Sequence, residues 1–209
     1  MDWHLIAAVL VTMAASYLLG CCNTSIVISK YVLRDDVRNH GSGNAGLTNF
    51  YRVFGKQKIL LVILADVLKT VIAVLAGAAL FRWAGNDPII GKLLGGLLCM
   101  VGHMFPFQFE FKGGKGVACS AAVGFFVDPL WGSAAIVACL AVIALTRFIS
   151  LGSMTMLFCY MVLMCIAHWG QWAVCLFTVV LFAMCVWRHR SNIQRLLSGT
   201  ENRIGQKAK

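Results

Sequence analysis

The sequence predicts an all-α integral membrane protein, a polytopic bundle of about seven transmembrane helices. Three observations support this prediction. First, 60% of the 209 residues are apolar and only 12% are charged, a composition outside the usual range of soluble domains. Second, several apolar segments approach the roughly 20 residues that a helix needs to cross the hydrocarbon core of a bilayer. Third, the net charge of +10 is gathered in short loops and near the C-terminal end, as expected where cations stay on the cytoplasmic side of a membrane.

Seven apolar segments are expected to form helices. They cover residues 4–28, 59–81, 91–109, 117–127, 130–145, 149–167 and 171–187. The first segment has no basic leader and no clear small-residue cleavage site, so we expect it to be retained as a span and not removed as a signal peptide. Gly91 and Gly95 give the third segment a GxxxG spacing, which suits close packing of helices.

The fourth segment is short for a span. At 1.5 Å per residue, 117–127 rises only about 16 Å, roughly half of the hydrocarbon core. Asp128 and Pro129 interrupt the apolar run that follows it. Residues 117–145 therefore form either one kinked span or a pair of short ones, and five or six crossings result if the fourth segment is re-entrant.

The distribution of cations predicts the orientation of the chain. The loop over 29–58 carries six lysines and arginines, and the tail from Arg188 onward carries six more. Both regions are expected in the cytoplasm. An odd number of spans with the N-terminus outside satisfies both, and it also places Lys112, Lys115 and Arg147 on the cytoplasmic side. Seven segments are therefore favoured, with a cytoplasmic C-terminus. No internal repeat or linker is evident, so residues 1–209 are expected to form a single membrane domain.

The nine cysteines do not indicate a disulfide framework or a metal site. None of them forms a CxxC pair, and most lie in apolar segments, where free cysteine acts as a small apolar side chain. The basic balance does not indicate nucleic acid, because the cations lie in the loops and tail of a membrane protein. Membrane lipids are the expected surroundings.

The first polar cluster is HGSGNAGLTN, residues 40–49, together with Arg52. It contains a literal GxGxxG, but no strand precedes it, so a dinucleotide fold is not indicated. Its glycines let the backbone approach a phosphate, and Arg52 can bind phosphate through two parallel hydrogen bonds. The neutral hydrogen-bonding side chains are Ser42, Asn44, Thr48 and Asn49. The alternative is a polar turn that only joins two spans.

The second polar cluster is GHMFPFQFEFKGGKGVA, residues 102–118. Pro106 should end the helix that carries His103. The glycines that follow leave the backbone free to turn successive amides toward one anion, and Lys115 adds charge. These glycines are Gly113, Gly114 and Gly116, and Lys112 precedes them. The alternative is a loop whose lysines only extend from the bilayer toward water.

The third polar cluster runs from His189 to Glu201 and contains Asn192 and Arg195. Taken alone, it could be a basic anchor after a last span. All three clusters, however, fall on the same predicted face of the membrane. An anion site at a membrane edge predicts an enzyme that joins a phosphate-bearing soluble molecule to a lipid.

Two charges lie within the second apolar segment. Asp66 and Lys69 are three residues apart and share one helix face. Because charges in a membrane usually face a bundle interior or a site, they form either a mutually satisfied structural pair or the floor of a substrate site.

Several signatures of other lipid enzymes are missing from the sequence. No histidine is followed by an aspartate at the His-x4-Asp spacing of the usual soluble-donor acyltransferases, and no GxSxG nucleophile motif occurs. The vicinal Asp35 and Asp36 are the only candidate carboxylate cluster for a metal-dependent phosphotransfer, and they are interpreted as loop charge.

At the three polar clusters the sequence resembles the acyl-phosphate:glycerol-3-phosphate acyltransferase family of bacterial membrane enzymes, the PlsY family. GSGNAGLTNFYR matches the first motif of that family, GHMFPFQFEFKGGKGVA the second, and HRSNIQRLLSGTENRIG the third. The run from Asp66 to Lys69 and the segment from Thr146 to Ser153 also look like family features. Leu47, residues 21–24 and Thr70 depart from the usual pattern, at positions that concern packing more than charge.

The resemblance implies a seven-helix fold in the bacterial cytoplasmic (inner) membrane, with the active site on the cytoplasmic face. It implies transfer of a fatty acyl group from acyl phosphate to the sn-1 hydroxyl of glycerol 3-phosphate. The products would be 1-acyl-glycerol 3-phosphate (lysophosphatidic acid) and phosphate, in the first acylation of phospholipid synthesis. Neither a cofactor nor a metal is expected.

The roles expected at the site follow from these substrates. Catalytic roles are expected for Ser42, Lys115, His189 and Asn192. Substrate binding is expected for Asn44, Thr48, Asn49, Arg52, His103, Lys112, Gly113, Gly114, Gly116, Arg195 and Glu201. The glycine-rich loop is assigned to the acyl phosphate, and Arg52, with Lys112 or Arg195, to glycerol 3-phosphate. The proton acceptor is either His189 or a phosphate oxygen of a substrate, while His103 could instead form hydrogen bonds at a helix end.

Two other classes of protein remain open on the sequence alone. A small transporter or channel for phosphorylated solutes would use the same cations, but no inverted repeat is evident. A headgroup phosphotransferase would normally need metal-binding acids, which the sequence does not supply in a cluster.

Overall fold

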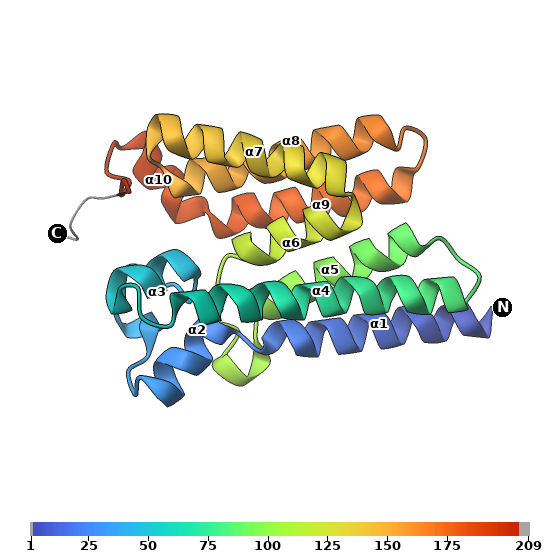
Figure 1. Ribbon diagram of the computed structural model, residues 1–209, viewed down its shortest axis with the longest axis horizontal. Coiled ribbons are helices and arrows are strands. Elements are labelled where there is room, and N and C mark those ends of the chain that lie inside the picture. The colour runs from blue at the N-terminus through green and yellow to red at the C-terminus, as the bar shows by residue number, and fades with distance from the viewer. Residues whose placement is uncertain (1, 205–209) are drawn as a thin grey trace. The chain divides into compact units, whose positions relative to one another are not determined.

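The computed structural model describes residues 2–204, and this part of the chain contains helices and no strand (Figure 1). Lys207 and Lys209, two of the cations expected in the cytoplasmic tail, lie outside the described residues. The chain divides into two compact units, the first ending at Val123 and the second beginning at Gly124. The division falls within α6 (Val117–Val127).

The first unit is built on three long helices. These are α1 (Trp3–Cys21), α4 (Ile59–Trp83) and α5 (Pro88–Met104). Small residues let their backbones approach closely: a Cβ on Gly91 would collide with the carbonyl of Gly77, and one on Gly95 would collide with the carbonyl of Ala73. The GxxxG spacing of the sequence therefore serves packing between α4 and α5, as expected from its small side chains.

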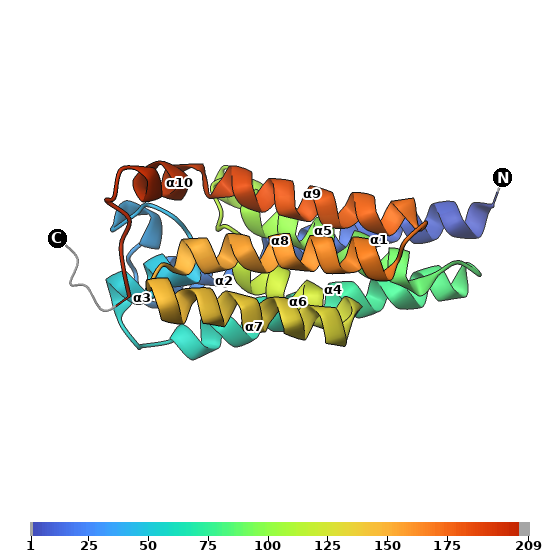
Figure 2. The ribbon, with the colours of Figure 1, turned by 90° about the horizontal axis from the view of Figure 1, so that it is seen from above.

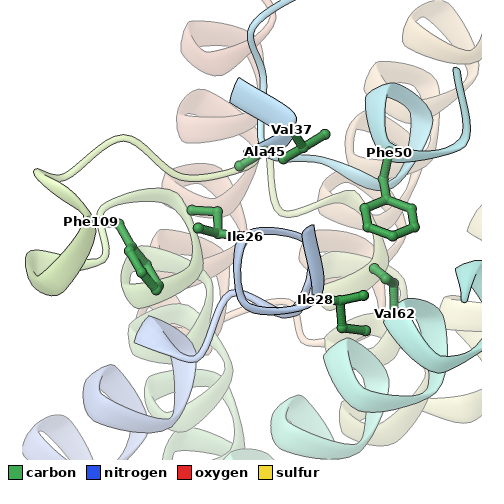
Figure 3. Packing of buried hydrophobic residues seen from close by; sticks show 7 residues of the cluster. All are labelled: Ile26, Ile28, Val37, Ala45, Phe50, Val62 and Phe109. Atoms are coloured by element: carbon green, nitrogen blue, oxygen red, sulfur yellow. The ribbon is translucent and has the colours of Figure 1, made fainter. Parts of the chain in front are cut away.

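Short helical elements fill the loop between α1 and α4. They are α2 (Thr24–Val27), the π-helix η1 (Ile28–Val32), the 3₁₀-helix η2 (Val37–Asn39) and α3 (Leu47–Phe54). A second 3₁₀-helix, η3 (Phe107–Phe109), follows α5. Buried apolar side chains from this loop pack together with Phe109 of η3 and Val62 of α4 (Figure 3). The two loops that carry the first and second polar clusters thus share one apolar core, and this packing holds the two loops together.

The first apolar segment is not one continuous helix as the sequence predicted. It breaks after Cys21, and Asn23 caps α2 by accepting a hydrogen bond from the amide of Ile26 at 3.2 Å. The break turns the carbonyls of Gly20 and Cys22 toward the ammonium group of Lys69, at 3.3 and 2.8 Å. A cation is favourable at the C-terminal end of a helix, so the break is stabilised by a charge from another helix.

The second unit contains three apolar helices and a short polar one. They are α7 (Pro129–Thr146), α8 (Ile149–Ala167), α9 (Trp172–Arg188) and α10 (Arg190–Leu197), seen from above in Figure 2. The Asp128 side chain caps α7 by accepting hydrogen bonds from the amides of Leu130 and Trp131, at 3.1 and 3.2 Å. Because Pro129 occupies the first turn of α7, residues 117–145 form two helices and not one kinked span.

All seven predicted apolar segments are helical, but they differ in their ability to cross a membrane. Within residues 2–204, five candidate spans are long and apolar enough, and α9 with α10, bent by 60°, counts as a sixth if the pair is one span. The α6 helix has 11 residues and falls short of this length. The structure thus has the seven expected apolar helices, but only five or six candidate spans where about seven were expected.

Candidate active site

Asn49 holds the loop that carries the first polar cluster. Its side-chain oxygen accepts a hydrogen bond from the amide of Ser42 at 2.9 Å, and its amide group donates to the carbonyls of Val37 and His40, each at 3.0 Å. The side chain is buried, with 2% exposure. Its oxygen also occupies the space that a Cβ on Gly41 would need, and Gly41 has a φ of +59°. Asn49 was predicted to contact substrate, and in this geometry it supports the Ser42 loop from beneath.

The other residues predicted in the first cluster are more accessible. Ser42 and Thr48 are exposed, and Asn44 and Arg52 are half-buried. Thr48 and Arg52 lie on α3, one turn apart, so both extend from the same face of that short helix. In the first cluster, then, Asn49 is buried beneath the loop, and the other four predicted side chains are accessible to solvent.

Arg38 connects the first cluster to the second, a link that the sequence analysis missed. Its guanidinium pairs with the Asp36 carboxylate at 2.7 Å and donates to the carbonyl of Phe109 at 3.0 Å. The hydrogen bond from Arg38 holds the pKa of Asp36 below its ordinary value, although partial burial of the carboxyl raises that pKa. The available signal was the vicinal acidic pair at 35 and 36, which the sequence analysis treated as loop charge.

The glycine-rich loop packs tightly on the end of α5. The amides of Gly113 and Gly114 donate to the carbonyls of Met104 and His103, each at 3.1 Å. Neither position has room for a side chain, because a Cβ on Gly113 would collide with the carbonyl of His103 and one on Gly114 with its imidazole. Gly116 has a φ of +75°, which a residue with a Cβ adopts only under strain.

The loop leads directly into the N-terminal end of a helix. Lys115 is half-buried, and α6 begins at Val117. Backbone amides and the helix dipole make such an end suitable for a phosphate. Lys112, by contrast, is exposed and pairs with exposed Glu110 at 2.7 Å. That contact lowers the pKa of Glu110.

The first two clusters lie against each other within the first unit. The carbonyl oxygen of Ala45 is 2.9 Å from the position that a Cβ on Gly114 would occupy. Ala45 and Phe109 also belong to the same buried apolar cluster (Figure 3). The structure therefore brings together the two loops that the sequence assigned to two anions.

Below the glycine-rich loop lies a buried group of charges. Lys69 and Asp66 form an ion pair at 2.7 Å, and the Nδ1 atom of His103 is 3.1 Å from the Lys69 ammonium. All three side chains are buried, as expected for charges within spans. His103, predicted to bind substrate, is 4% exposed.

The third cluster lies in the second unit, where Glu201 organises it. One Glu201 oxygen accepts hydrogen bonds from Asn192 at 2.6 Å and Ser150 at 2.8 Å, and the other accepts one from Arg195 at 2.7 Å. Partial burial raises the pKa of the Glu201 carboxyl, but these hydrogen bonds outweigh it and hold the pKa below its ordinary value. Glu201 was predicted to bind substrate, and here it orients two other predicted site residues. Ser150, which sequence reasoning did not select, lies in the 146–153 segment that already resembled the family.

His189 is buried at the junction of α9 and α10. Its Nδ1 atom is 2.8 Å from the carbonyl oxygen of Cys185. A carbonyl oxygen can only accept, so Nδ1 carries a proton and Nε2 is the basic nitrogen of the neutral ring. This tautomer suits a general base that acts through Nε2.

The tail after α10 is tied to the turn between α7 and α8. The amide of Ile204 donates to the carbonyl of Arg147 at 2.9 Å, and the Arg147 guanidinium donates to the carbonyl of Ile204 at 3.1 Å. Arg203 lies over the ring of Phe148, 5.1 Å from its centre. These contacts explain why Glu201 is held in place although it follows the last helix.

No group of three His, Cys, Asp or Glu residues that could hold a metal ion occurs within residues 2–204. The expectation of chemistry without a metal therefore stays a prediction.

A chain whose described residues form apolar helices long enough to cross a membrane, with polar clusters in the loops between them, has the structure of an integral membrane protein. A family model described as glycerol-3-phosphate acyltransferase matches residues 10–199. The chain is 42% identical over 196 residues to the glycerol-3-phosphate acyltransferase of Thermoanaerobacter pseudethanolicus, covering 94% of this chain and 96% of the relative. It is 41% identical over 197 residues to the enzyme of the same description from Halalkalibacterium halodurans, covering 92% and 93%.

Two crystal structures of PlsY, an integral membrane glycerol 3-phosphate acyltransferase, have the same fold. The glycerol 3-phosphate form superposes with a TM-score of 0.85 at 36% identity, covering 94% of this chain and 96% of that one. The lysophosphatidic acid form superposes with a TM-score of 0.81 at 34% identity, covering 94% and 95%. The chain belongs to the glycerol-3-phosphate acyltransferase family, and it is an enzyme of phospholipid synthesis embedded in a membrane.

Proposed function

We propose that this enzyme transfers a fatty acyl group from acyl phosphate to the sn-1 hydroxyl of glycerol 3-phosphate, giving lysophosphatidic acid and phosphate. The related PlsY structures are described as glycerol 3-phosphate and lysophosphatidic acid forms, which supports the acceptor and the product. The closeness of Ala45 and Gly114 places the first polar cluster beside the glycine-rich loop, which supports two neighbouring phosphate sites. A reaction between two phosphate-bearing substrates needs two such sites.

The glycine-rich loop is the proposed site of the acyl phosphate. Lys115, Gly116 and the first turn of α6 would stabilise the phosphate as negative charge develops on it. The amides of Gly113 and Gly114 donate to α5 carbonyls, so these two glycines contribute by keeping the loop close to α5 and free of side chains. Donors already in place need no reorganisation during the reaction, which is why they are effective.

Glycerol 3-phosphate is proposed to bind at Arg52, assisted by Lys112 or Arg195. Arg195 is fixed through its Nε atom by Glu201, and Lys112 is paired with Glu110. Hydroxyl and carbonyl groups of the substrates would be oriented by the neutral side chains of the first and third clusters. These are Ser42, Asn44, Thr48 and Asn192.

The chemical step is a direct transfer. The C1 hydroxyl oxygen of glycerol 3-phosphate attacks the acyl carbonyl carbon, the bond between that carbon and the phosphate oxygen breaks, and phosphate leaves with the electron pair. The hydroxyl proton passes to Nε2 of His189 or to a phosphate oxygen. A mixed anhydride has a good leaving group, so no covalent acyl-enzyme is needed. Neither a cofactor nor a metal is proposed.

The two units are proposed to act as one acyltransferase domain in a bacterial cytoplasmic membrane, with the site on the cytoplasmic face and the N-terminus outside. The family model spans both units, and the cations of 29–58 and of the tail support this orientation.

The test uses purified protein in detergent or lipid, with palmitoyl phosphate and glycerol 3-phosphate and without added metal. Phosphate release and lysophosphatidic acid formation are measured together, with palmitoyl-CoA as the control donor. Equal amounts of both products, an inert palmitoyl-CoA and no effect of EDTA would support the proposal. Phosphate release without the acylated product would contradict the acceptor. Folded protein that forms neither product would instead favour a carrier of phosphorylated solutes.

A further inference from the structure

The buried group formed by Asp66, Lys69 and His103 lies beneath the glycine-rich loop, and its internal contacts set the protonation of the imidazole. The Lys69 ammonium lies 2.7 Å from the Asp66 carboxylate, 2.8 Å from the carbonyl of Cys22 and 3.1 Å from Nδ1 of His103. The carbonyl of Gly20 is farther away, at 3.3 Å. An ammonium group has three donors and no acceptor, so the imidazole cannot donate to it. Nδ1 therefore accepts from Lys69, and the ring carries its proton on Nε2.

The Asp66 carboxylate does not compete for that nitrogen. Its Oδ1 atom is 3.6 Å from Nδ1 of His103, beyond a good hydrogen bond. The same oxygen accepts from Thr24 at 3.0 Å and pairs with Lys69. The carboxylate thus fixes the ammonium, and the ammonium fixes the imidazole.

The protonated edge of the imidazole faces the glycine-rich loop. A Cβ added to Gly114 would collide with Nε2 of His103, so the ring edge and the loop backbone are in direct contact. The main chain adds a second link, because the amide of Gly114 donates to the carbonyl of His103 at 3.1 Å. That carbonyl also accepts from the side chain of Asn23 at 3.2 Å.

The backbone of α4 at Asp66 also contacts the start of α6, just after the loop. The thiol of Cys119, in the first turn of α6, lies 3.9 Å from the backbone carbonyl of Asp66. The loop therefore contacts the His103 side chain where it leaves α5, and the chain that follows it packs on the backbone of α4 where α6 begins.

We infer that His103 is a positioning residue for acyl transfer: Asp66 and Lys69 hold its ring so that the Nε2–H edge sets the position of the Gly113–Gly116 loop. This inference rests on the proposed function of that loop as the acyl-phosphate site. It replaces the expectation that His103 contacts substrate. It also combines the two interpretations of Asp66 and Lys69: the pair is satisfied internally, and through His103 it supports the proposed binding loop.

The first test compares three substitutions at one position. His103→Gln places an amide donor near the position of Nε2, whereas His103→Asn places its amide near Nδ1 and His103→Ala has no donor. We expect kcat/KM for palmitoyl phosphate to fall about tenfold or more in the Asn and Ala variants. The Gln variant should stay within about threefold of the wild type, and KM for glycerol 3-phosphate should change less than about twofold in all three.

Other outcomes of this comparison would overturn the inference. Equal loss in the Gln, Asn and Ala variants would mean that the donor at Nε2 is unimportant. Parallel changes in KM for both substrates would indicate a general requirement of the fold. An unchanged kcat/KM in the Ala variant would remove His103 from the reaction. Thermal melting of each purified variant shows which of them is folded.

Gly114→Ala tests the same contact from the loop side, without changing a buried charge. Its methyl group would press on the imidazole and on the carbonyl of Ala45, so it should produce the same selective loss for palmitoyl phosphate. Equal losses for both substrates in this variant would count against the inference.

A measurement that needs no turnover separates this inference from the proposed function. The ¹⁵N spectrum of histidine-labelled protein, assigned by comparison with His103→Gln, should show a proton on Nε2 of His103. A neutral ring protonated on Nδ1 would overturn the inference even in an active enzyme. Wild-type protein that shows the Nε2–H ring but no transfer from palmitoyl phosphate would contradict the proposed function alone.

Discussion

The side-chain oxygen of Asn49 accepts a hydrogen bond from the backbone amide of Ser42 at 2.9 Å. The same side chain donates to two loop carbonyls, so one buried amide satisfies three backbone groups. Few side chains can replace it, because the position needs an acceptor on one side and two donors on the other.

Asn49→Ala is expected to lower both activity and stability. It leaves the Ser42 amide and the carbonyls of Val37 and His40 without this partner, which costs about 1–3 kcal/mol. Release of the Ser42 loop should lower kcat by about tenfold or more. Turnover and thermal melting measure the two effects. Asn49→Asp, which keeps the acceptor and loses both donors, should not restore activity. Tyr51→Phe, at an exposed position of the same helix, is the control.

The sequence predicted the seven apolar helices because apolar length and helix-ending residues are local signals. It did not predict the break after Cys21, because that break depends on Lys69, which lies on another helix. The sequence also predicted that Asn49 and Glu201 contact substrate, and it gave no sign of the partners that each has within the chain. A polar residue in a motif looks alike whether it faces a ligand or another part of the chain, so these partners depend on the tertiary structure, and the contacts with substrate stay a prediction.

Glu201→Gln should disrupt the third cluster. The carboxylate accepts hydrogen bonds from Ser150, Asn192 and Arg195, and an amide group in its place would turn a donor toward one of these donors. We expect a loss of about 1–3 kcal/mol in stability and a large fall in kcat, because Asn192 is released. Gln194→Ala, an exposed position of α10, provides the matched control. A Gln variant with normal melting and turnover would show that Glu201 does not orient the cluster.

The same carboxylate predicts how stability depends on pH. Its pKa is lower in the folded chain than the ordinary value of 4.5, so the unfolded chain binds a proton more readily. Its contribution to stability is present above the ordinary value and is lost as pH falls from there through the depressed folded pKa. Melting temperature measured from pH 7 downward should therefore fall less steeply in Glu201→Gln than in the wild type. Identical slopes below pH 4.5 would contradict this account.

Lys115→Ala should abolish most transfer while the protein still folds and inserts. Lys115 is half-buried next to the N-terminal end of α6, where its charge would stabilise the departing phosphate. Removing one such donor typically costs about 100-fold or more in kcat. Lys56→Ala, an exposed lysine in the 29–58 loop, should remain active. Near-normal turnover of folded Lys115→Ala would remove this lysine from the chemistry.

Arg52→Lys should act mainly on the acceptor. A guanidinium binds phosphate through two parallel hydrogen bonds, and an ammonium group cannot reproduce that geometry. KM for glycerol 3-phosphate should rise about tenfold, while KM for palmitoyl phosphate changes little. Initial rates with each substrate varied in turn provide the measurement. If KM for glycerol 3-phosphate is unchanged, another cation holds that phosphate.

Arg38 provides the last prediction, because it connects the two anion-adapted loops without belonging to either predicted site. Its guanidinium pairs with Asp36 and donates to the carbonyl of Phe109. Arg38→Lys keeps the charge but cannot make both contacts in the same geometry. We therefore expect kcat/KM to fall several-fold, by about the same factor for both substrates, because the two loops would no longer be held in their relative positions. Selective loss for one substrate would instead place Arg38 in that substrate's own site.

Arg34→Lys, in the same loop, is the matched control. Its activity should be unchanged, because the exposed Arg34 side chain lies outside this link.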